Sequence, residues 1–151
     1  MKYLLLSMLS FILAACSGVP EHRDAGQQYP VTVTHLGTTV DPQTAQVDVH
    51  ITVRSGFPRT LKTLRVFVAL YDGAGTQIGN DEAIEILGPI KNGQTIGPLE
   101  KVTALRDRSV KCVGVVRVEA VMMDYATKTL SGAEADSLVD DPRSKRCSAA
   151  S

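Results

Sequence analysis

The chain has 151 residues, and its 16 basic residues are balanced by 16 acidic ones. Because this balance leaves no strong net charge, the composition favours neither nucleic acid nor an anionic surface as a partner. A chain of this length is the size of one domain and is long enough to bury a core without metal ions. We therefore expect a single domain with no cofactor and no nucleic-acid partner.

The first fifteen residues have the pattern of an export signal. Lys2 supplies a short positive region, and the uncharged run 3–15 follows it. This run is too short to cross a bilayer, because a spanning helix needs about 20 apolar residues. An ordinary secretory signal cut after Ala15 is the alternative, but its small-x-small rule requires a small residue at the position of Leu13.

The end of this run, Leu13-Ala14-Ala15-Cys16, resembles the lipobox of bacterial lipoproteins. The resemblance implies that residues 1–15 are a signal peptide that is removed. Cys16 then becomes the mature N-terminus and carries a diacylglyceryl group and usually an N-acyl chain such as palmitate. Two or more acyl chains hold a protein durably at a membrane. Because Ser17 follows the cysteine in place of aspartate, the resemblance also implies the outer membrane, with the domain facing the periplasm.

Residues 16–28 predict a flexible tether behind the lipid. They are mostly polar, include Pro20, and show neither helical nor strand periodicity. A coil of this length spans about 20 Å, so the domain would stay close to the membrane surface. We expect the folded domain to cover residues 29–139 and a C-terminal tail to cover residues 140–151.

From Tyr29 onward, short β-branched runs alternate with turn residues, which is typical of an antiparallel all-β protein. Residues 31–40, with an interruption before Leu36, predict the first strand. Residues 46–53 alternate strictly between apolar and polar side chains, so one face enters the core and His50 lies on the other. Residues 61–71 end in a run that is apolar on both faces, which predicts a central strand.

The second half of the chain predicts a hairpin and two further strands. Residues 72–75 supply the turn, because glycine accepts the positive φ that hairpin loops need. A strand from 76 to 86 returns from this turn. The remaining features, in chain order, are a reversal at Pro89 and Asn92-Gly93, a strand over 95–102 and a polar connection over 105–109.

The run 111–125 favours a strand over a helix, because it is rich in valine and alternates through Arg117. Strict alternation would place Val113 and Val115 on the same face as Arg117, with Gly114 as the candidate position of a bulge. Residues 131–139 predict one short helical turn. Seven or so short strands together predict an immunoglobulin-like antiparallel two-sheet sandwich, since a half-polar sheet must cover its apolar face.

The central hairpin also carries a family resemblance. Val68-Ala69-Leu70-Tyr71-Asp72 resembles the motif of the FxLYD family of extracytoplasmic β-sandwich domains, with Val68 where the family has phenylalanine. Gly75 and Gly79 fit the turn and the return strand of that family, and the resemblance covers residues 47–95. It implies a non-catalytic module of exported proteins.

Two cysteines remain once Cys16 is assigned to lipid. Cys112 and Cys147 belong to a chain that is exported to an oxidising compartment, which favours a disulfide between them. Such a bridge would stabilise the fold by about 3–4 kcal/mol on the loop-entropy model. The alternative is two unpaired thiols, one in a strand and one in the tail.

Catalytic and metal-binding signatures are missing from the sequence. His22, His35 and His50 do not have the spacing of a zinc site. The acidic pairs Asp81-Glu82 and Asp140-Asp141 do not lie at EF-hand spacing. Neither a nucleophile elbow nor a phosphate-binding loop is present. We therefore expect no enzyme, no catalytic residue and no metal ligand.

Three classes of function remain open. The favoured one is a non-catalytic protein-binding or assembly module of the cell envelope, because exposed edge strands are templates for a partner strand. The alternative is a small-molecule or glycan binder that uses Phe57-Pro58 and the 73–75 loop at one end of the sandwich. An enzyme would need a constellation hidden from the sequence, such as His50 beside a carboxylate. We expect Phe57, Tyr71 and Tyr125 to pack in the core or under loops.

Overall fold

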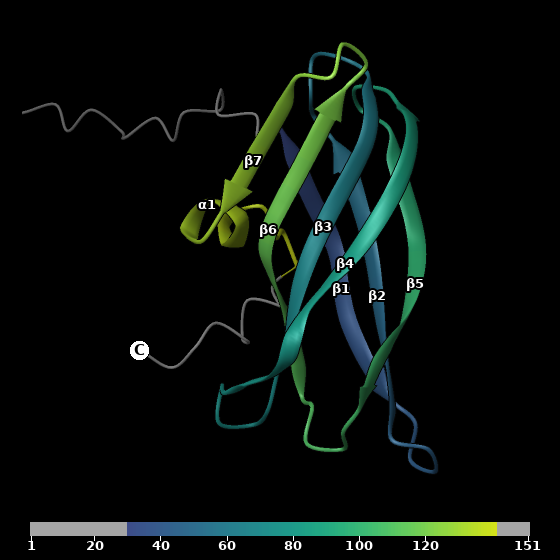
Figure 1. Ribbon diagram of the computed structural model, residues 1–151, viewed down its shortest axis with the longest axis vertical. Helices are drawn as coiled ribbons and strands as arrows, with labels where there is room; N and C mark the ends of the chain where they lie inside the picture. The colour runs from purple at the N-terminus through teal and green to yellow at the C-terminus, as the bar shows by residue number, and fades with distance from the viewer. Residues whose placement is uncertain (1–29, 142–151) are drawn as a thin grey trace, which may run out of the picture.

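The computed structural model describes residues 30–141 (Figure 1). The proposed signal peptide, Cys16 with its tether, and Cys147 lie outside these residues. The described part contains seven strands and one short helix. They are β1 (Val31–Val40), β2 (Gln46–Ser55), β3 (Leu61–Tyr71), β4 (Gln77–Ile90), β5 (Thr95–Arg106), β6 (Cys112–Met122), β7 (Thr127–Ser131) and α1 (Ala133–Ser137).

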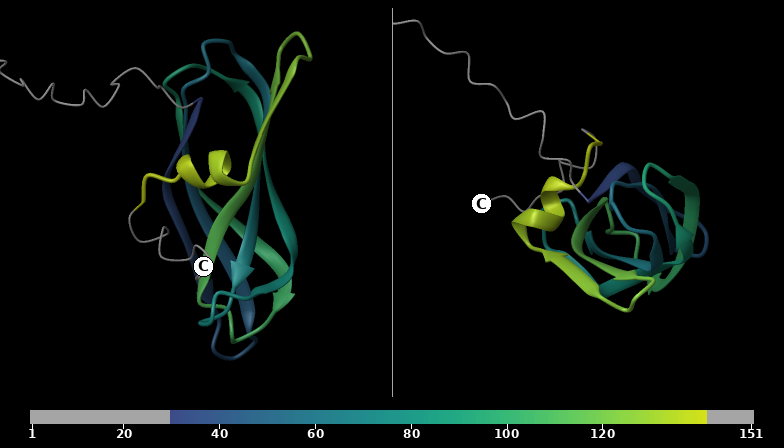
Figure 2. Two further views of the ribbon diagram at one scale, coloured as in Figure 1. Left: turned by 90° about the vertical axis from the view of Figure 1, so that its left-hand side faces the viewer. Right: turned by 90° about the horizontal axis from the view of Figure 1, so that it is seen from above.

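The strands form two antiparallel sheets that pack face to face, so the predicted sandwich is confirmed (Figure 2). One sheet has the order β1-β2-β5 and the other β4-β3-β6-β7. In constant-type immunoglobulin domains the fourth strand lies in the sheet of the first two, whereas here β4 pairs with β3. Strand β3 therefore has a neighbour on each side, as its apolar end predicted.

The alternation of β2 builds one wall of the core. Val47, Val49, Ile51 and Val53 are all fully buried, while the intervening residues from Gln46 to Thr52 are only half-buried. Burying a branched apolar side chain stabilises a fold by about 1.5–3 kcal/mol relative to leaving it in water. The period of two in this segment therefore predicted the core face correctly.

A bulge at Val116 divides β6 into two registers. Arg117 pairs with Phe67 of β3 but Val115 pairs with Val68, so one extra residue lies between them. Val113 and Val115 are buried before the bulge, whereas Arg117 after it lies over the Phe67 ring, 3.8 Å from the centroid, on the outer face. The prediction of strict alternation was wrong, because one inserted residue exchanges the two faces of a strand.

Strands β4 and β5 run further than the sequence predicted. Pro89 lies inside β4 and does not mark a reversal; the register of β4 against β3 shifts beside it. A proline is tolerated there because β4 is an edge strand, where a missing N–H breaks no ladder. The connection to β6 covers residues 107–111 and not 105–109, since β5 continues to Arg106. Strand β7 was missed.

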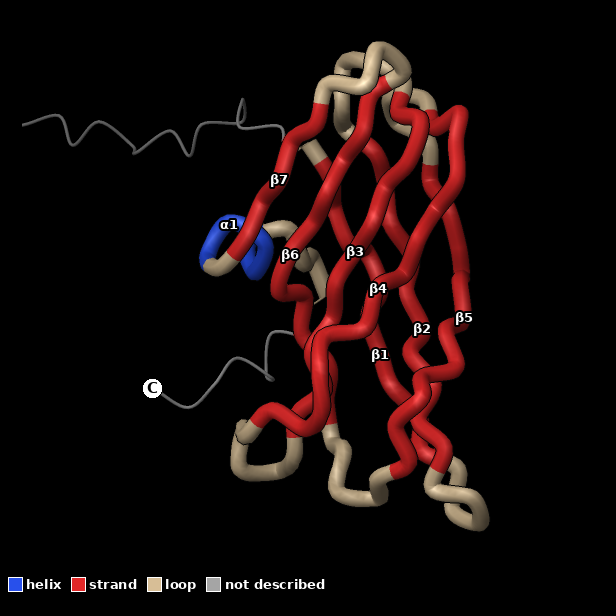
Figure 3. Tube along the Cα trace, viewed as in Figure 1, coloured by secondary structure: helices blue, strands red, loops and turns tan. Residues whose placement is uncertain are grey.

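The loops gather at the two ends of the sandwich (Figure 3). The Tyr125 end carries the loops 56–60, 91–94 and 123–126, and the Asp72 end carries the loops 41–45, 72–76 and 107–111. The backbone nitrogen of Gly56 donates to the Pro30 carbonyl at 2.9 Å, and that of Met123 donates to the Thr60 carbonyl at 3.3 Å. The described chain therefore begins at the Tyr125 end.

One side of the sandwich is closed by the segment that follows β7. The predicted helical turn is present as α1, which contacts β6 and β7. After it, Val139 forms a parallel bridge to Val33 of β1, and the Asp140 nitrogen donates to the Val33 carbonyl at 2.9 Å. The opposite side, between the edge strands β4 and β5, has no such cover within residues 30–141.

Candidate functional site

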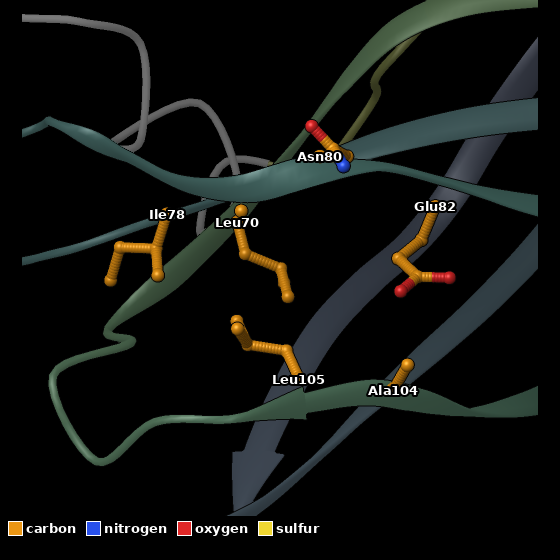
Figure 4. Close-up of a pocket in the computed structure, with 7 residues that line it drawn as sticks. Leu70, Ile78, Asn80, Glu82, Ala104 and Leu105 are labelled. Atoms are coloured by element: carbon orange, nitrogen blue, oxygen red, sulfur yellow. The ribbon is translucent and has the colours of Figure 1, made fainter.

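A pocket of about 240 Å³ opens between β4 and β5 (Figure 4). The side chains of Leu70, Ile78 and Leu105 point toward one another and form its apolar part. Glu82 of β4 points toward Ala104 of β5 at the other part. Since Leu70 is almost fully buried, it is the floor of the pocket, and the β4 and β5 side chains are its rims.

A second bulge shapes this pocket. Leu70 of β3 pairs with Ile78, but Val68 pairs with Glu82, so β4 carries extra residues between these two pairs. Gly79 has a φ of 72°, a left-handed conformation that glycine adopts without strain. The Gln77 amide nitrogen donates to Asp81 Oδ1 at 2.9 Å and holds the bulge together. The bulge turns β4 aside next to Leu70, as bulges beside binding sites do.

The size and chemistry of the pocket restrict what it can hold. Sites for small molecules usually enclose about 300–1,000 Å³, and this pocket encloses about 240 Å³. Its volume suits one large apolar side chain better than a whole ligand. Glu82 is half-buried and offers a carboxylate at the rim, so a cationic or N–H group next to that side chain would be favoured.

The loops named for a small-molecule site lie far apart. Phe57-Pro58 precedes β3 and the 73–75 loop follows it, so the two loops are at opposite ends of the sandwich. The expectation that they share one end was wrong, because one extended strand joins them. Phe57 is 2% exposed and belongs to the core, as expected. Tyr125 is 70% exposed, so its expected packing in the core or under a loop was wrong.

The two described histidines contact neighbouring strands or segments. His50 Nε2 lies 3.0 Å from Thr39 Oγ1, and Glu100 lies opposite His50 in the register of β5. His35 Nδ1 lies 3.5 Å from Asp141 Oδ2, and the same carboxylate oxygen accepts the Leu36 backbone N–H. The Asp141 carboxylate thus serves to hold the segment after α1 on β1.

The predicted disulfide has only one of its two cysteines among the described residues. Cys112 is half-buried at the start of β6, opposite Tyr71 in β3, while its expected partner Cys147 lies outside the described residues. Within residues 30–141, no three His, Cys, Asp or Glu side chains are grouped to hold a metal ion. The same part of the chain contains no helix with the length and hydrophobicity to cross a membrane.

The sequence did not point to the pocket residues. Ile78, Glu82 and Leu105 come from two strands that do not pair with each other, so no local pattern connects them. The only signal was Gly79 inside a strand-like run, which suggests a bulge or a close approach of backbone. No protein-family model, curated protein or solved structure matches this chain.

Proposed function

We propose that this protein is a lipid-anchored, non-catalytic binding module of the bacterial cell envelope. In this proposal Cys16 carries the lipid, and the open side of the sandwich holds an extended segment of a partner protein along β4. The anchor rests on the residues Leu13-Ala14-Ala15-Cys16 and the uncharged run before them. The pocket beside the open edge of β4 is the observation that carries the binding role.

The edge of β4 has the properties of a template for a partner strand. It is the longest strand and an outermost one, so its outward backbone groups face away from β3. When a peptide adds to a sheet edge, main-chain hydrogen bonds supply affinity and pockets for alternate side chains supply specificity. A pocket sized for one side chain, directly beside such an edge, matches this mode of binding.

The lining of the pocket describes the partner segment. An apolar side chain would enter between Leu70, Ile78 and Leu105, and a lysine or arginine nearby in the segment would meet Glu82. Binding of a small molecule or glycan is the weaker alternative, because the pocket is smaller than usual ligand sites and has few polar groups.

Site-specific crosslinking in intact cells tests the binding role. A photoreactive phenylalanine at Asn80, an exposed residue that lines the pocket, should yield a defined protein adduct, and the same probe at Thr129 on β7 should not. Ala104→Arg should abolish the adduct, because Ala104 is exposed at the rim and a long side chain there fills the pocket. Thr129→Arg is the matched control. Equal labelling from both positions, or an adduct that survives Ala104→Arg, would contradict the proposal.

Fractionation tests the anchor separately. Cys16→Ser should move the protein out of the membrane fraction, whereas Cys112→Ser should leave it there. A Cys16→Ser protein that is held at the membrane as firmly as the unaltered one would exclude the lipid anchor. The crosslinking experiment would still test the binding role, but for a protein without a lipid on Cys16.

A further inference from the structure

The Tyr125 end of the sandwich presents exposed apolar side chains. Tyr125 is 70% exposed and Met123 is 57% exposed, and both belong to the hairpin turn between β6 and β7. Tyr125 has a φ of 67°, and its nitrogen donates to the Met122 carbonyl at 2.9 Å, so these residues close a tight turn at the tip of the hairpin. The hairpin projects from the sandwich in Figure 2. Neither side chain contributes to the core cluster.

Basic residues lie at the same end of the sandwich as this hairpin turn. Lys62 Nζ lies 4.1 Å from the centroid of the Tyr125 ring, and Lys91 and Lys128 are exposed in or next to the loops of the same end. The three loops of this end are 56–60, 91–94 and 123–126, and Asp124 is the only carboxylate in them. Its side chain is paired with Arg59. Three lysines therefore remain without a compensating acidic residue in the loops.

The opposite end has a different charge. Each of its three loops begins with an aspartate, and these loops contain only two basic residues. The aspartates are Asp41, Asp72 and Asp107, and the basic residues are Arg108 and Lys111. Arg106, which directly precedes the 107–111 loop, adds a third positive charge, so the charges of this end balance. The zero net charge of the whole chain thus conceals one basic end and one neutral end.

In the sequence, Cys16 with its proposed lipid precedes Pro30, and Pro30 lies at the basic end of the domain. Pro30, where the described chain begins, contacts Gly56 at the Tyr125 end. Residues 17–29 separate it from Cys16, and a coil of that length spans about 20 Å. A surface held this close to a bilayer meets it at high effective concentration, so weak contacts suffice to orient the domain.

We propose that the Tyr125 end docks on the anionic phospholipid surface of the membrane that anchors the protein. This inference rests on the proposed lipid anchor. Tyr125 and Met123 enter the interface between headgroups and acyl chains, where tyrosine is enriched because its ring is apolar and its hydroxyl is polar. Lys62, Lys91 and Lys128 bind the anionic headgroups, an attraction that salt weakens. The long axis of the sandwich then stands away from the membrane, and β4 stays accessible from the side.

A single tryptophan reports on this contact, because the chain contains none. Tyr125→Trp places the probe at the docking end. Ala74→Trp, in an exposed turn of the Asp72 end, is the matched control. The mature lipidated variants are reconstituted in vesicles of phosphatidylethanolamine and phosphatidylglycerol, with and without brominated acyl chains. Flotation of the vesicles measures the anchor independently.

The expected result is a blue-shifted emission for Tyr125→Trp and at least twofold quenching by brominated lipid, with Ala74→Trp unaffected. Combining Tyr125→Trp with Lys91→Glu and Lys128→Glu should reduce the quenching. Floating protein with no quenching at either position would overturn the docking while the anchor stands. Protein that does not float would overturn the anchor itself. Equal quenching at Tyr125→Trp and Ala74→Trp would also overturn the proposal, as would equally strong quenching of Tyr125→Trp in vesicles of phosphatidylcholine alone. A blue shift of Tyr125→Trp that appears only when other envelope proteins are added would overturn it as well.

Discussion

Asp141 Oδ2 lies 3.5 Å from His35 Nδ1, a contact that joins the last described residue of the chain to the first strand. The Asp141 side chain is 10% exposed, whereas that of His35 is 53% exposed. Because the same oxygen accepts the Leu36 backbone N–H, the carboxylate closes one side of the sandwich. The β4–β5 side, which holds the pocket, has no equivalent among the described residues.

The first prediction concerns this contact. Asp141→Ala should lower the free energy of unfolding by about 1–3 kcal/mol, because it removes a charged hydrogen-bond acceptor from a mostly buried position. Asp140→Ala is the control, since Asp140 is exposed and only its backbone is known to bond to β1. It should change stability by less than about 0.5 kcal/mol. Urea denaturation measures both, and equal losses would contradict the assignment.

The second prediction contrasts two aromatic residues at the same end. Phe57→Ala should destabilise the domain by about 3–5 kcal/mol, because it empties a core position. Tyr125→Ala should cost no more than about 1 kcal/mol, the scale of an exposed cation–π contact such as the one with Lys62. Thermal unfolding of the two variants distinguishes them. A large loss from Tyr125→Ala would mean that the hairpin is structural.

The third prediction concerns a glycine under close backbone contact. A Cβ at Gly97 would lie 2.8 Å from the Ile51 carbonyl oxygen, and the φ of Gly97 is 127°. Gly97→Ala should therefore destabilise the domain by about 1–3 kcal/mol. Gly73→Ala is the control, because its nearest neighbour is the Lys111 side chain at 3.7 Å. Its stability should be unchanged or slightly raised, and a Gly97→Ala protein of normal stability would refute the steric argument.

The fourth prediction concerns acid. The pKa of Asp41 is lowered by the backbone N–H groups of Thr44 and Gln43, and that of Asp124 by its hydrogen bond to Arg59. The Ser109 hydroxyl and N–H likewise lower the pKa of Asp107. A carboxyl group whose pKa is lower in the folded protein than in the unfolded protein stabilises the fold at pH values above its unfolded pKa of about 4. This stabilisation is lost as the pH falls through the pKa of the group in the folded protein. Stability should therefore fall below about pH 4.

Denaturation at a series of pH values checks this dependence. Asp41→Asn keeps an oxygen that can accept the turn hydrogen bonds but removes the titrating charge. The variant should lose less stability than the unaltered protein between about pH 5 and pH 2. An identical slope for the two proteins would show that the Asp41 carboxylate does not contribute to acid sensitivity.

The fifth prediction concerns Cys112 and Cys147. Mature protein purified without reductant should have an intact mass about 2 Da below that of the dithiol form, and reduction should cost about 3–4 kcal/mol of stability. Cys112→Ser is the control, because its stability should not respond to reductant. Two thiols that alkylate without prior reduction would leave the alternative of unpaired cysteines.

The sequence by itself determined the class of the fold, and it is the basis of the lipid anchor and membrane location proposed for the protein. The strict alternation over residues 46–53 specified which face is buried, because side chains on a strand alternate with a period of two. The turn over residues 72–75 was also evident, since Asp72 Oδ1 accepts the N–H groups of Ala74 and Thr76 within the same short loop. These features depend on neighbours along the chain, and local patterns record them.

Only the tertiary structure decided which side of the sandwich holds the pocket and which charged side chains gather at its ends. The bulge at Val116 changes the face of half a strand through its pairing with β3, which no alternation within β6 reveals. The pocket joins Ile78 and Leu105 from strands in different sheets. Lys62, Lys91 and Lys128 are far apart in the sequence of a chain with zero net charge. Antiparallel folding brings them to one end, because each lies in or next to a loop there.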